Sequence, residues 1–578
     1  MTIQNREIAA IFEEIADLLE IEGAEAFRVR AYREAAGVIP GLGEDLADLV
    51  AAGADLTELP SVGEAIAKKI EVIVETGQLP QLEAVRQRVP PSLRELLHLG
   101  GLGPKRVWAL HEGLGVASLA DLRGAVEAGR VHELPGFGEK TEAQLRERLA
   151  RWQGPSSRTP LIEAEGLVRP LLEYLRGAPG IADLTVAGSF RRRRETVGDL
   201  DILVACDDGG AVAERFVGYG AVAEVLAHGE TRASVRLRSG IQVDLRVVPT
   251  ASWGAALHYF TGSKAHNVAV RRRGVERGLK ISEYGVYRGD EAIAGRTEES
   301  IYAAVGLPFI APELREDRGE IEAAERGALP ALVTPDDIRG DLHAHTDATD
   351  GQDSLAAMAE AAAALGYEYL AITDHTKHLG VVHGLDATRL AAQIDAIDRL
   401  NERLAEQYQG RFQILKASEV DILEDGSLDL PDEILARLDL RVASIHYKFD
   451  LPEHRQTERV IRAMDNRHFN ILAHPTGRLI GAREPYAIDL ERVMRAALER
   501  GCFLELNAQP SRLDLTELAC KQAKELGLKV AISTDAHSRA GLEMMRFGIG
   551  QARRGWLAAD DVINTRPLAA LRRLLRRD

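Results

Sequence analysis

The chain has 578 residues, of which 45% are hydrophobic and 28% are charged, and its formal net charge is −17. This ordinary globular composition excludes a disordered chain and a fibre. No run approaches the roughly 18 apolar residues of a transmembrane helix, so we expect no membrane partner. Three widely spaced cysteines (Cys206, Cys502 and Cys520) exclude a disulfide framework and a thiolate zinc site. At about 150 residues per domain, the length predicts about four domains.

The charge pattern bears on location and partners. Arg6 and Glu7 lie where a signal peptide would have its apolar core, so we expect a cytoplasmic protein. Net acidity usually argues against a nucleic-acid partner, but basic residues cluster at 191–194 and again within 264–280. Because a local basic face matters more than the charge of the whole chain, DNA or RNA stays a candidate partner.

Residues 1–150 are predicted to be helical, because apolar residues recur at three- and four-residue spacing. A Gly-rich turn followed by a charged helix occurs there three times, at 59–70, 98–110 and 133–145. Such a turn points free N–H groups of the second helix outward, where they can bind DNA phosphates. A single copy could equally be a plain connection between packed helices, but three copies favour DNA binding and resemble helix-hairpin-helix motifs. The candidate DNA-binding residues are Gly63, Gly101, Gly103, Lys105, Gly136, Gly138 and Lys140.

Lys68 and Lys69 lie on the helix after the first of these turns. A lysine that is partly desolvated or close to other cations has a lowered pKa and can form a Schiff base with a sugar aldehyde. The alternative is a solvated surface lysine, and the sequence does not decide between the two.

Three aspartates mark the region 155–250, whose short β-branched runs predict strands. Asp199 and Asp201 are two residues apart in one run, so both side chains project from one face. Asp244 lies in a second run that can pair beside the first. Converging carboxylates repel one another unless divalent cations neutralise them, and Mg²⁺ prefers such oxygen ligands together with substrate phosphates.

Gly188 and Ser189 precede these aspartates and are followed by an arginine cluster that includes Arg192. The turn at Gly188-Ser189 would hold a triphosphate through its N–H groups and hydroxyl, and Arg192 would neutralise it. An Asp-x-Asp pair alone is more often a strand end with solvated acids. The neighbouring Gly-Ser turn, the arginines and the third aspartate together favour a metal site.

The segments GSFRRRRETVGDLD, VDLRVV and YFTGSKAHN resemble the nucleotidyltransferase core of the family X DNA polymerases, the group of DNA polymerase beta. RAYREAA and LPSVGEAIAKKIEVIVETG resemble its lyase domain. The resemblance implies that Asp199, Asp201 and Asp244 bind two metal ions, Mg²⁺ or Mn²⁺, for phosphoryl transfer. It also implies that Lys69 is the Schiff-base lysine of a 5′-deoxyribose phosphate lyase. The implied nucleotide-binding residues are Ser189, Arg192, Gly198, Tyr259, Phe260, Thr261, Gly262, Ser263, Lys264 and Asn267.

The sequence departs from the animal enzyme at two positions. Lys264 and His266 replace an acid and an aromatic residue. A cation at these positions is expected to hold the incoming nucleotide even before the metal ions bind.

Ten of the 16 histidines lie between His343 and His537, in a region where apolar strands alternate with amphipathic helices. This alternation predicts a parallel βα domain. Six of its segments end an apolar strand with a polar, metal-binding residue type, and the C-terminal strand ends of a βα barrel all open on one face. Imidazole and carboxylate ligands suit Zn²⁺ or Mn²⁺, in a site for two or three ions. The candidate ligands are His343, His345, Asp350, His375, Glu419, His446, His474, Asp535 and His537.

These segments resemble the PHP (polymerase and histidinol phosphatase) superfamily, whose fold is a distorted (β/α)7 barrel. The resemblance implies phosphoester hydrolysis, with Glu419 as the bridging ligand. Asn507 and Arg512 are expected to orient the substrate phosphate, and Asn507 is not counted as a ligand because it is neutral where some relatives carry an acid.

A polymerase core joined to a PHP domain resembles the bacterial family X polymerases, over nearly the whole chain. This resemblance implies a monomeric, nucleoid-associated repair enzyme that fills short gaps in primer-template DNA from deoxynucleoside triphosphates. It also implies a metal-dependent 3′→5′ exonuclease, with cleavage at abasic sites in some relatives. The expected fold is multidomain α/β: a helical region 1–80 with lyase-like character, a fingers-like region 81–153, a mixed-sheet palm 154–250, a thumb-like subdomain 251–315, a linker 316–338 and the barrel 339–578.

Two other functions compete with this interpretation. One is a nuclease or phosphatase whose polymerase core is vestigial, against which the complete Asp199, Asp201 and Asp244 set argues. The other is a DNA-binding scaffold, which requires both metal sites to be inactive.

Overall fold

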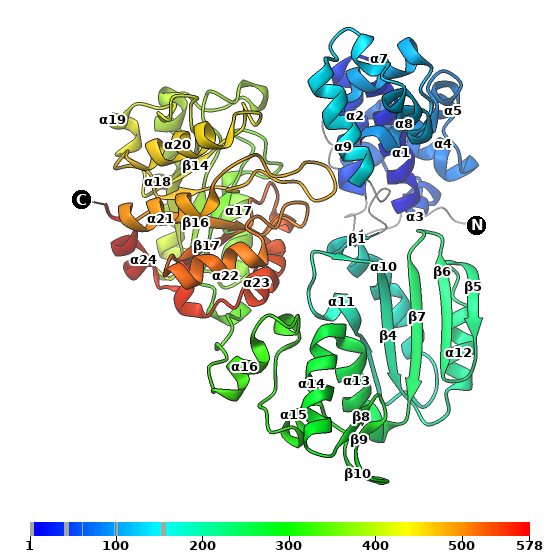
Figure 1. The fold of residues 1–578 in the computed structure, drawn as a ribbon. Coiled ribbons are helices and arrows are strands. Elements are labelled where there is room, and N and C mark those ends of the chain that lie inside the picture. The colour runs from blue at the N-terminus through cyan, green and yellow to red at the C-terminus, as the bar shows by residue number, and fades with distance from the viewer. Residues whose placement is uncertain are drawn as a thin grey trace. The chain divides into compact units, whose positions relative to one another are not determined.

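The computed structural model describes residues 5–39, 46–59, 62–97, 99, 102–151 and 158–577. The chain divides into two compact units, Met1–Ser156 and Ser157–Asp578 (Figure 1).

The first unit is built from helices around one apolar core. In its first helix Phe12, Ile15 and Leu19 follow one another at three- and four-residue spacing, and all three are buried. The predicted helical N-terminal region is therefore confirmed. The helices are α1 (Asn5–Glu22), α2 (Ala26–Val38), α3 (Leu46–Ala51), α4 (Glu64–Thr76), α5 (Pro80–Arg86), α6 (Arg94–Leu97), α7 (Pro104–Leu114), α8 (Leu119–Glu127) and α9 (Glu139–Arg151).

The second unit begins with a mixed sheet in the order β2-β4-β7-β6-β5. Strand β4 runs parallel to β7 and antiparallel to β2, and α10 and α12 pack on one face of the sheet. Ile202 points to those helices, whereas Leu203 contacts the other face, because side chains alternate along a strand. The elements are β1 (Thr159–Pro160), α10 (Leu161–Arg176), β2 (Asp183–Val186), α11 (Gly188–Arg191), β3 (Thr196–Val197), β4 (Asp199–Ala205), α12 (Gly210–Val217), β5 (Val222–His228), β6 (Arg232–Leu237) and β7 (Gln242–Val248).

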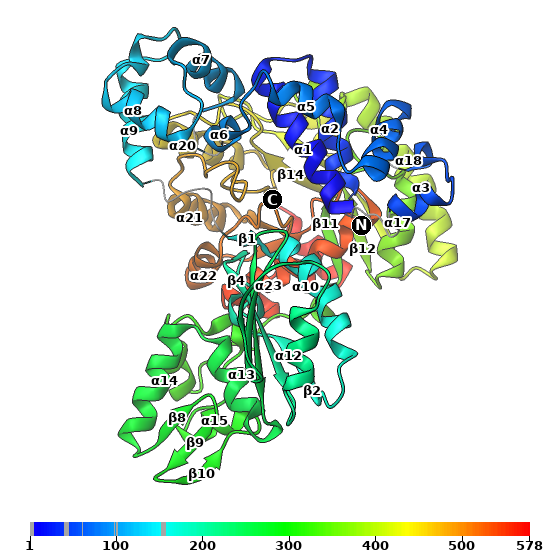
Figure 2. The same ribbon diagram turned by 90° about the vertical axis from the view of Figure 1, so that its right-hand side faces the viewer.

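A smaller helix-and-strand region follows and covers the second face of this sheet through α13 (Figure 2). The segment 316–338, predicted as a linker, contains a helix with Glu320 and Ile321 buried, so part of it packs against this region. Its elements are α13 (Trp253–Thr261), α14 (Lys264–Glu276), β8 (Lys280–Ser282), β9 (Gly285–Arg288), β10 (Glu291–Ala294), α15 (Glu298–Ala304) and α16 (Glu320–Glu325).

Seven parallel strands form the C-terminal part, ordered in space as in the sequence. A parallel bridge between Ala344 and Ala536 brings the last strand beside the first, so the sheet nearly closes and the predicted (β/α)7 barrel is confirmed. The elements are β11 (Gly340–Ala344), α17 (Leu355–Ala364), β12 (Tyr369–Ile372), α18 (Ala387–Gln407), β13 (Gln413–Asp421), α19 (Asp432–Leu435), β14 (Leu440–Ser444), α20 (Glu453–Met464), β15 (Ile471–Leu472), α21 (Leu490–Arg500), β16 (Phe503–Asn507), α22 (Glu517–Leu526), β17 (Val530–Ser533), α23 (Met545–Arg554) and α24 (Leu568–Leu575).

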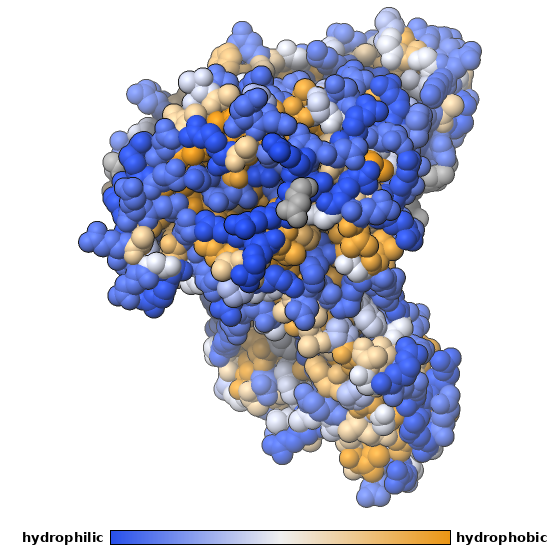
Figure 3. Space-filling view, turned by 90° about the vertical axis from the view of Figure 1, so that its left-hand side faces the viewer, coloured by the Kyte–Doolittle hydropathy of each residue, from blue (hydrophilic) through white to orange (hydrophobic). Residues whose placement is uncertain are grey.

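The surface is polar over most of the face drawn in Figure 3, where hydrophobic residues form small separate groups. Within the part of the chain that the structure describes, no helix combines the length and the hydrophobicity needed to cross a bilayer.

Candidate active sites

The register of two strands brings the predicted palm carboxylates together. Asp201 on β4 lies beside Asp244 on β7, and Asp199 projects from the same face two residues earlier. Gln242 Nε2 donates to Asp244 at 3.0 Å, and Ser234 donates to it from β6. Burial, followed by the charges of Asp199 and Asp244, raises the pKa of Asp201 to about 7. A divalent cation would relieve this repulsion, so the trio fits a metal site.

Asp199 and Asp201 line a cavity of about 510 Å³, whereas Asp244 does not. Of the predicted nucleotide-binding residues, seven line it: Ser189, Arg192, Tyr259, Phe260, Gly262, Lys264 and Asn267. Gly198, Thr261 and Ser263 do not. Thr261 is buried and accepts a hydrogen bond from Arg191 at 2.7 Å, whereas Ser263 caps α14.

Lys264 and His266, the two positions at which the sequence departs from the animal enzyme, lie in different surroundings. Lys264 lines the cavity, as predicted. His266 is fully buried, with Nδ1 2.7 Å from Glu320 and Nε2 2.9 Å from the Tyr302 hydroxyl. Burial lowers the pKa of His266. The expectation that His266 holds the nucleotide is therefore wrong, because its ring is occupied inside the fold.

The arginine run 191–194 is paired rather than free. Arg191 binds both oxygens of Glu298, at 2.9 and 2.6 Å, and Arg193 binds Glu165 at 2.6 Å. The other two arginines, Arg192 and Arg194, have Glu316 within 3.1 and 3.9 Å. All four arginines thus have acidic partners, but Arg192 and Arg194 also line the cavity and leave positive charge there.

The Gly-rich turns of the first unit lie at exposed helix starts. Gly63 and Gly103 precede α4 and α7 without a side-chain cap, and Gly138 precedes α9. Lys105 and Lys140 are exposed in the first turns of α7 and α9, and Gly136 is exposed in the turn before α9. Gly101 lies outside the described residues. Uncapped N–H groups beside exposed lysines are suited to phosphates.

Lys69 lines a cavity of about 490 Å³ in the same unit, together with Lys68. Its Nζ donates to the carbonyl of Ala65 at 2.7 Å and lies 5.6 Å from the centre of the Tyr32 ring. Burial and the charge of Arg28 lower the pKa of Lys69. A lysine in this state is more nucleophilic than a solvated one.

Glu419 lies at the centre of the barrel site, at the carboxyl end of β13. Its two oxygens face different histidines. Oε2 lies 3.0, 3.4 and 3.6 Å from His375, His343 and His345. Oε1 lies 2.9 and 3.1 Å from His474 and His446.

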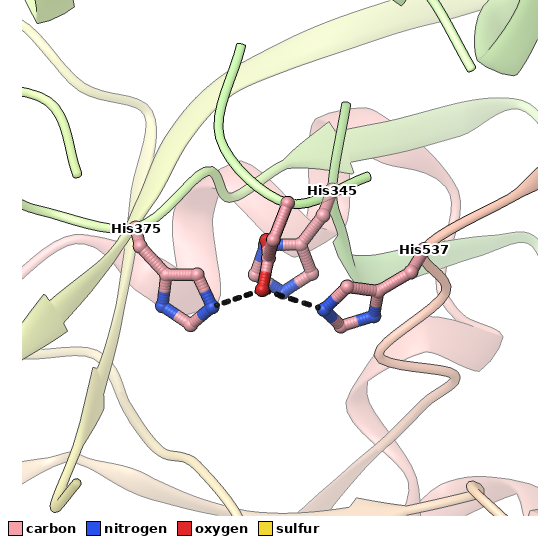
Figure 4. A group of neighbouring side chains, drawn as sticks. His345, His375 and His537 are labelled. Carbon is pink, nitrogen blue, oxygen red and sulfur yellow. Dashed lines mark hydrogen bonds and ion pairs between the residues drawn. The ribbon is translucent and has the colours of Figure 1, made fainter. Parts of the chain in front are cut away.

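Asp350 lies among a second group of histidines. In Figure 4 His345, His375 and His537 surround one carboxylate. Asp350 Oδ2 lies 3.2 Å from both His375 Nε2 and His537 Nε2. Asp535 completes a third group, 3.1 Å from His345 and 3.5 Å from His343. All nine predicted ligands therefore converge at the carboxyl ends of the strands.

The donor set fits metal ions. His345 Nδ1 and His343 Nε2 are buried without a hydrogen-bond partner, although carboxylates lie 3.4 to 3.6 Å away. Burial would lower the pKa of His446, but Glu419 and Asp421 raise it to about 9. Burial also opposes the charge on Glu419, yet the surrounding histidines hold its pKa well below the usual value. The histidine protons thus neutralise carboxylate charge that metal ions would neutralise if they were bound.

Comparison with known proteins identifies the family. The DNA polymerase/3'-5' exonuclease PolX of Bacillus subtilis (strain 168) is 38% identical over 580 residues, which cover 100% of both chains. The chain belongs to the bacterial family X DNA polymerases. Matching families along this polymerase are a helix-hairpin-helix domain (3–79), a SAM-like helix-hairpin-helix tandem (93–151), the DNA polymerase beta thumb (256–316) and the PHP domain (341–509). The resemblance found in the sequence motifs is confirmed.

Two further relatives each match part of this family X polymerase. DNA polymerase lambda of Rattus norvegicus is 26% identical over 350 residues, which are 54% of this chain and 57% of that protein. A probable phosphatase of Thermoanaerobacter sp. (strain X514) is 32% identical over 237 residues, 39% of this chain and 89% of its own length.

Several residues at the sites of this family X polymerase escaped the sequence interpretation. Glu505 accepts from His343 Nδ1 at 2.7 Å, and Asp421 lies 3.0 Å from His446 Nδ1, so both orient histidines that were predicted as ligands. A signal was present, because both lie in strand-end segments that carry candidate residues. Arg271 lines the palm cavity one helical turn after Asn267, whereas Arg158 lines it with no signal in the sequence. Asn507 donates to Asp535 at 3.0 Å, so its exclusion as a ligand agrees with the geometry.

Gly188 offers a test of the palm geometry of this family X polymerase. Its φ is +61°, and a Cβ added there would lie 2.3 Å from Asp201 Oδ2. We expect Gly188→Ala to displace that carboxylate and to lower nucleotide incorporation about tenfold or more, while primer shortening stays unchanged. Single-nucleotide incorporation rates on gapped DNA measure the effect. Gly220→Ala is the control, because a Cβ there meets nothing within 4 Å. An equal loss in both variants would contradict this account.

Proposed function

We propose that this protein fills short gaps in DNA by template-directed nucleotide insertion at the palm and shortens primer 3′ ends at the PHP site. One observation carries the proposal: the chain holds two separate clusters of candidate ligands, the three palm carboxylates on β4 and β7 and a group of nine residues that includes Glu419. We further propose that it acts as a monomer in the cytoplasm, at the nucleoid. Its domains would have the boundaries given by the sequence, except that part of the segment 316–338 packs against the thumb-like region.

At the palm, Asp199, Asp201 and Asp244 would hold Mg²⁺ or Mn²⁺. When bound, such ions neutralise triphosphate charge and favour deprotonation of the primer 3′-hydroxyl. Ser189, Arg192 and Gly198 would bind the triphosphate. The residues from Tyr259 to Ser263 would line the sugar, Asn267 would meet the minor-groove edge, and Lys264 would add a charge that does not depend on metal. Seven of the ten predicted nucleotide-binding residues line one cavity, which supports this assignment.

At the PHP site, the nine residues, Glu419 among them, would hold two or three Mn²⁺ or Zn²⁺ ions. Bound there, the ions supply Lewis acidity for phosphoester hydrolysis. Glu505 and Asp421 would fix the tautomers of His343 and His446 through their Nδ1 contacts. Arg512, whose Nε lies 3.8 Å from Asp535, would orient the substrate phosphate. We also propose that the same site cleaves DNA at abasic sites.

The test uses the full chain on a 5′-labelled primer beside a one-nucleotide gap, with Mn²⁺. With nucleotides the primer should lengthen by one residue, and without them it should shorten. Chelation by EDTA should stop both reactions. Shortening without extension under any metal would favour the nuclease with a vestigial polymerase core. Binding without either reaction would favour the DNA scaffold.

Lys69 is proposed as the nucleophile of a 5′-deoxyribose phosphate lyase. We expect Lys69→Ala to lower the yield of borohydride-trapped protein–DNA adduct by about a hundredfold, because covalent catalysis depends on one amine. The measurement uses DNA with a labelled 5′-deoxyribose phosphate.

Lys68→Ala is the matched control, since Lys68 lines the same cavity and is exposed. Adduct at the wild-type level in Lys69→Ala, or an equal loss in both variants, would remove Lys69 from this role.

A further inference from the structure

Arg554, the last residue of α23 in the PHP barrel, reaches the edge of the palm. Its side chain is buried, with the residue only 4% exposed. One terminal nitrogen donates to the backbone carbonyl of Arg192 at 2.8 Å and to Glu316 Oε1 at 3.0 Å. The other donates to Glu517 on α22 at 3.1 Å. A barrel residue therefore holds both the backbone and the partner of a cavity-lining arginine.

Glu316 is shared between the two arginines. The same Oε1 accepts from Arg192 Nε at 3.1 Å, and Arg192 Nη1 donates to the carbonyl of Thr261. Burial alone would raise the pKa of Glu316, but Arg192 and Arg554 hold it below its usual value. A buried carboxylate that accepts hydrogen bonds from two guanidiniums restrains both of them, because charge-assisted hydrogen bonds are strong and directional.

The turn that carries Arg192 also packs against α23. Arg193, the next residue, has a φ of +56° and lies with its guanidinium 5.3 Å from the centre of the Phe547 ring. A Cβ on Gly550 of α23 would come within 3.2 Å of Arg193 Nε, so the helix and the turn are in close approach. The backbone at Arg192 thus depends on the barrel for its position.

We propose that Arg554 is a positioning residue of the polymerase: it holds Glu316 and the Arg192 carbonyl so that the Arg192 guanidinium faces the incoming triphosphate. The inference rests on the proposed role of Arg192 in binding that triphosphate. The PHP barrel would then support the nucleotide pocket of the palm, and this role would be separate from its hydrolytic site.

The test compares full-length Arg554→Met with Arg553→Met. Arg553 is the preceding residue on α23 and joins the thumb-like region through Glu313, at 2.7 Å, without reaching Arg192. We expect Arg554→Met to raise the KM for the nucleotide on one-nucleotide-gapped DNA about tenfold or more, with a smaller effect on kcat. Primer shortening should keep its wild-type rate. Arg553→Met should leave the KM unchanged.

Arg192→Ala tests the triphosphate role of Arg192 separately from the positioning role of Arg554. If Arg192→Ala leaves the KM unchanged, the triphosphate role of Arg192 fails and the inference fails with it. If Arg192→Ala raises the KM but Arg554→Met matches wild type or Arg553→Met, only the inference fails. If Arg554→Met does not fold, Arg554→Lys is used instead, because lysine keeps the positive charge but lacks the two terminal nitrogens of arginine. A KM between those of wild type and Arg192→Ala supports the inference, and a wild-type KM overturns it.

Discussion

Replacing Asp201 with Asn should lower nucleotide incorporation by at least about a hundredfold. Loss of a residue that only orients a metal ligand typically costs 10- to 100-fold, and Asp201 is itself a proposed ligand. Asparagine keeps the shape but removes the charge that would be shared with Asp244 beside it. Primer shortening should keep its wild-type rate, since the nine PHP ligands are unchanged. Single-turnover incorporation on gapped DNA measures the first effect, and shortening without nucleotides measures the second.

Asp183→Asn is the control for this substitution. Asp183 lies on β2 of the same sheet and is exposed, at the opposite end of β4, where it pairs with Ala205. It should incorporate nucleotides at the wild-type rate. Wild-type incorporation by Asp201→Asn would show that the palm carboxylates do not carry the polymerase reaction.

Replacing Glu419 with Gln should lower primer shortening by at least about a hundredfold and leave incorporation unchanged. Its carboxylate lies within 3.6 Å of five histidines, so one neutral side chain would remove the negative charge that all five share. The amide nitrogen would also turn a donor toward ligand atoms. Release of labelled mononucleotides from the primer 3′ end measures the effect.

Glu424→Gln serves as its control, because Glu424 lies five residues further on and makes only exposed ion pairs, with Arg455 at 3.1 Å and Lys448 at 4.0 Å. Such pairs contribute little, so this variant should shorten primers normally. Full exonuclease activity in Glu419→Gln would place the hydrolytic reaction elsewhere.

The sequence was sufficient for the fold class and for much of both candidate sites. The nine barrel residues could be grouped because parallel strands end on one face, which makes a strand-end position informative even at large sequence separation. Asp199 and Asp201 could be assigned to one face because the side-chain period of a strand is two. The register of β4 against β7, which places Asp244 beside Asp201, needed the structure.

The sequence did not reveal the hydrogen-bond and ion-pair partners of individual charged residues. His266 sits beside Lys264 in the chain, but helical geometry turns it inward, where Glu320 and Tyr302 satisfy both nitrogens. The run 191–194 is basic in sequence, yet its acids come from distant segments such as Glu298 and Glu165. Long-range pairing of this kind leaves no local periodicity to detect.

The most direct test of two independent sites is a single gel assay. A 5′-labelled primer on one-nucleotide-gapped DNA is incubated with Mn²⁺, with and without nucleotides, and with wild type, Asp201→Asn or Glu419→Gln. The account predicts that extension disappears only in Asp201→Asn and that shortening disappears only in Glu419→Gln. Loss of both reactions in both variants would contradict it, because one site would then perform all the chemistry.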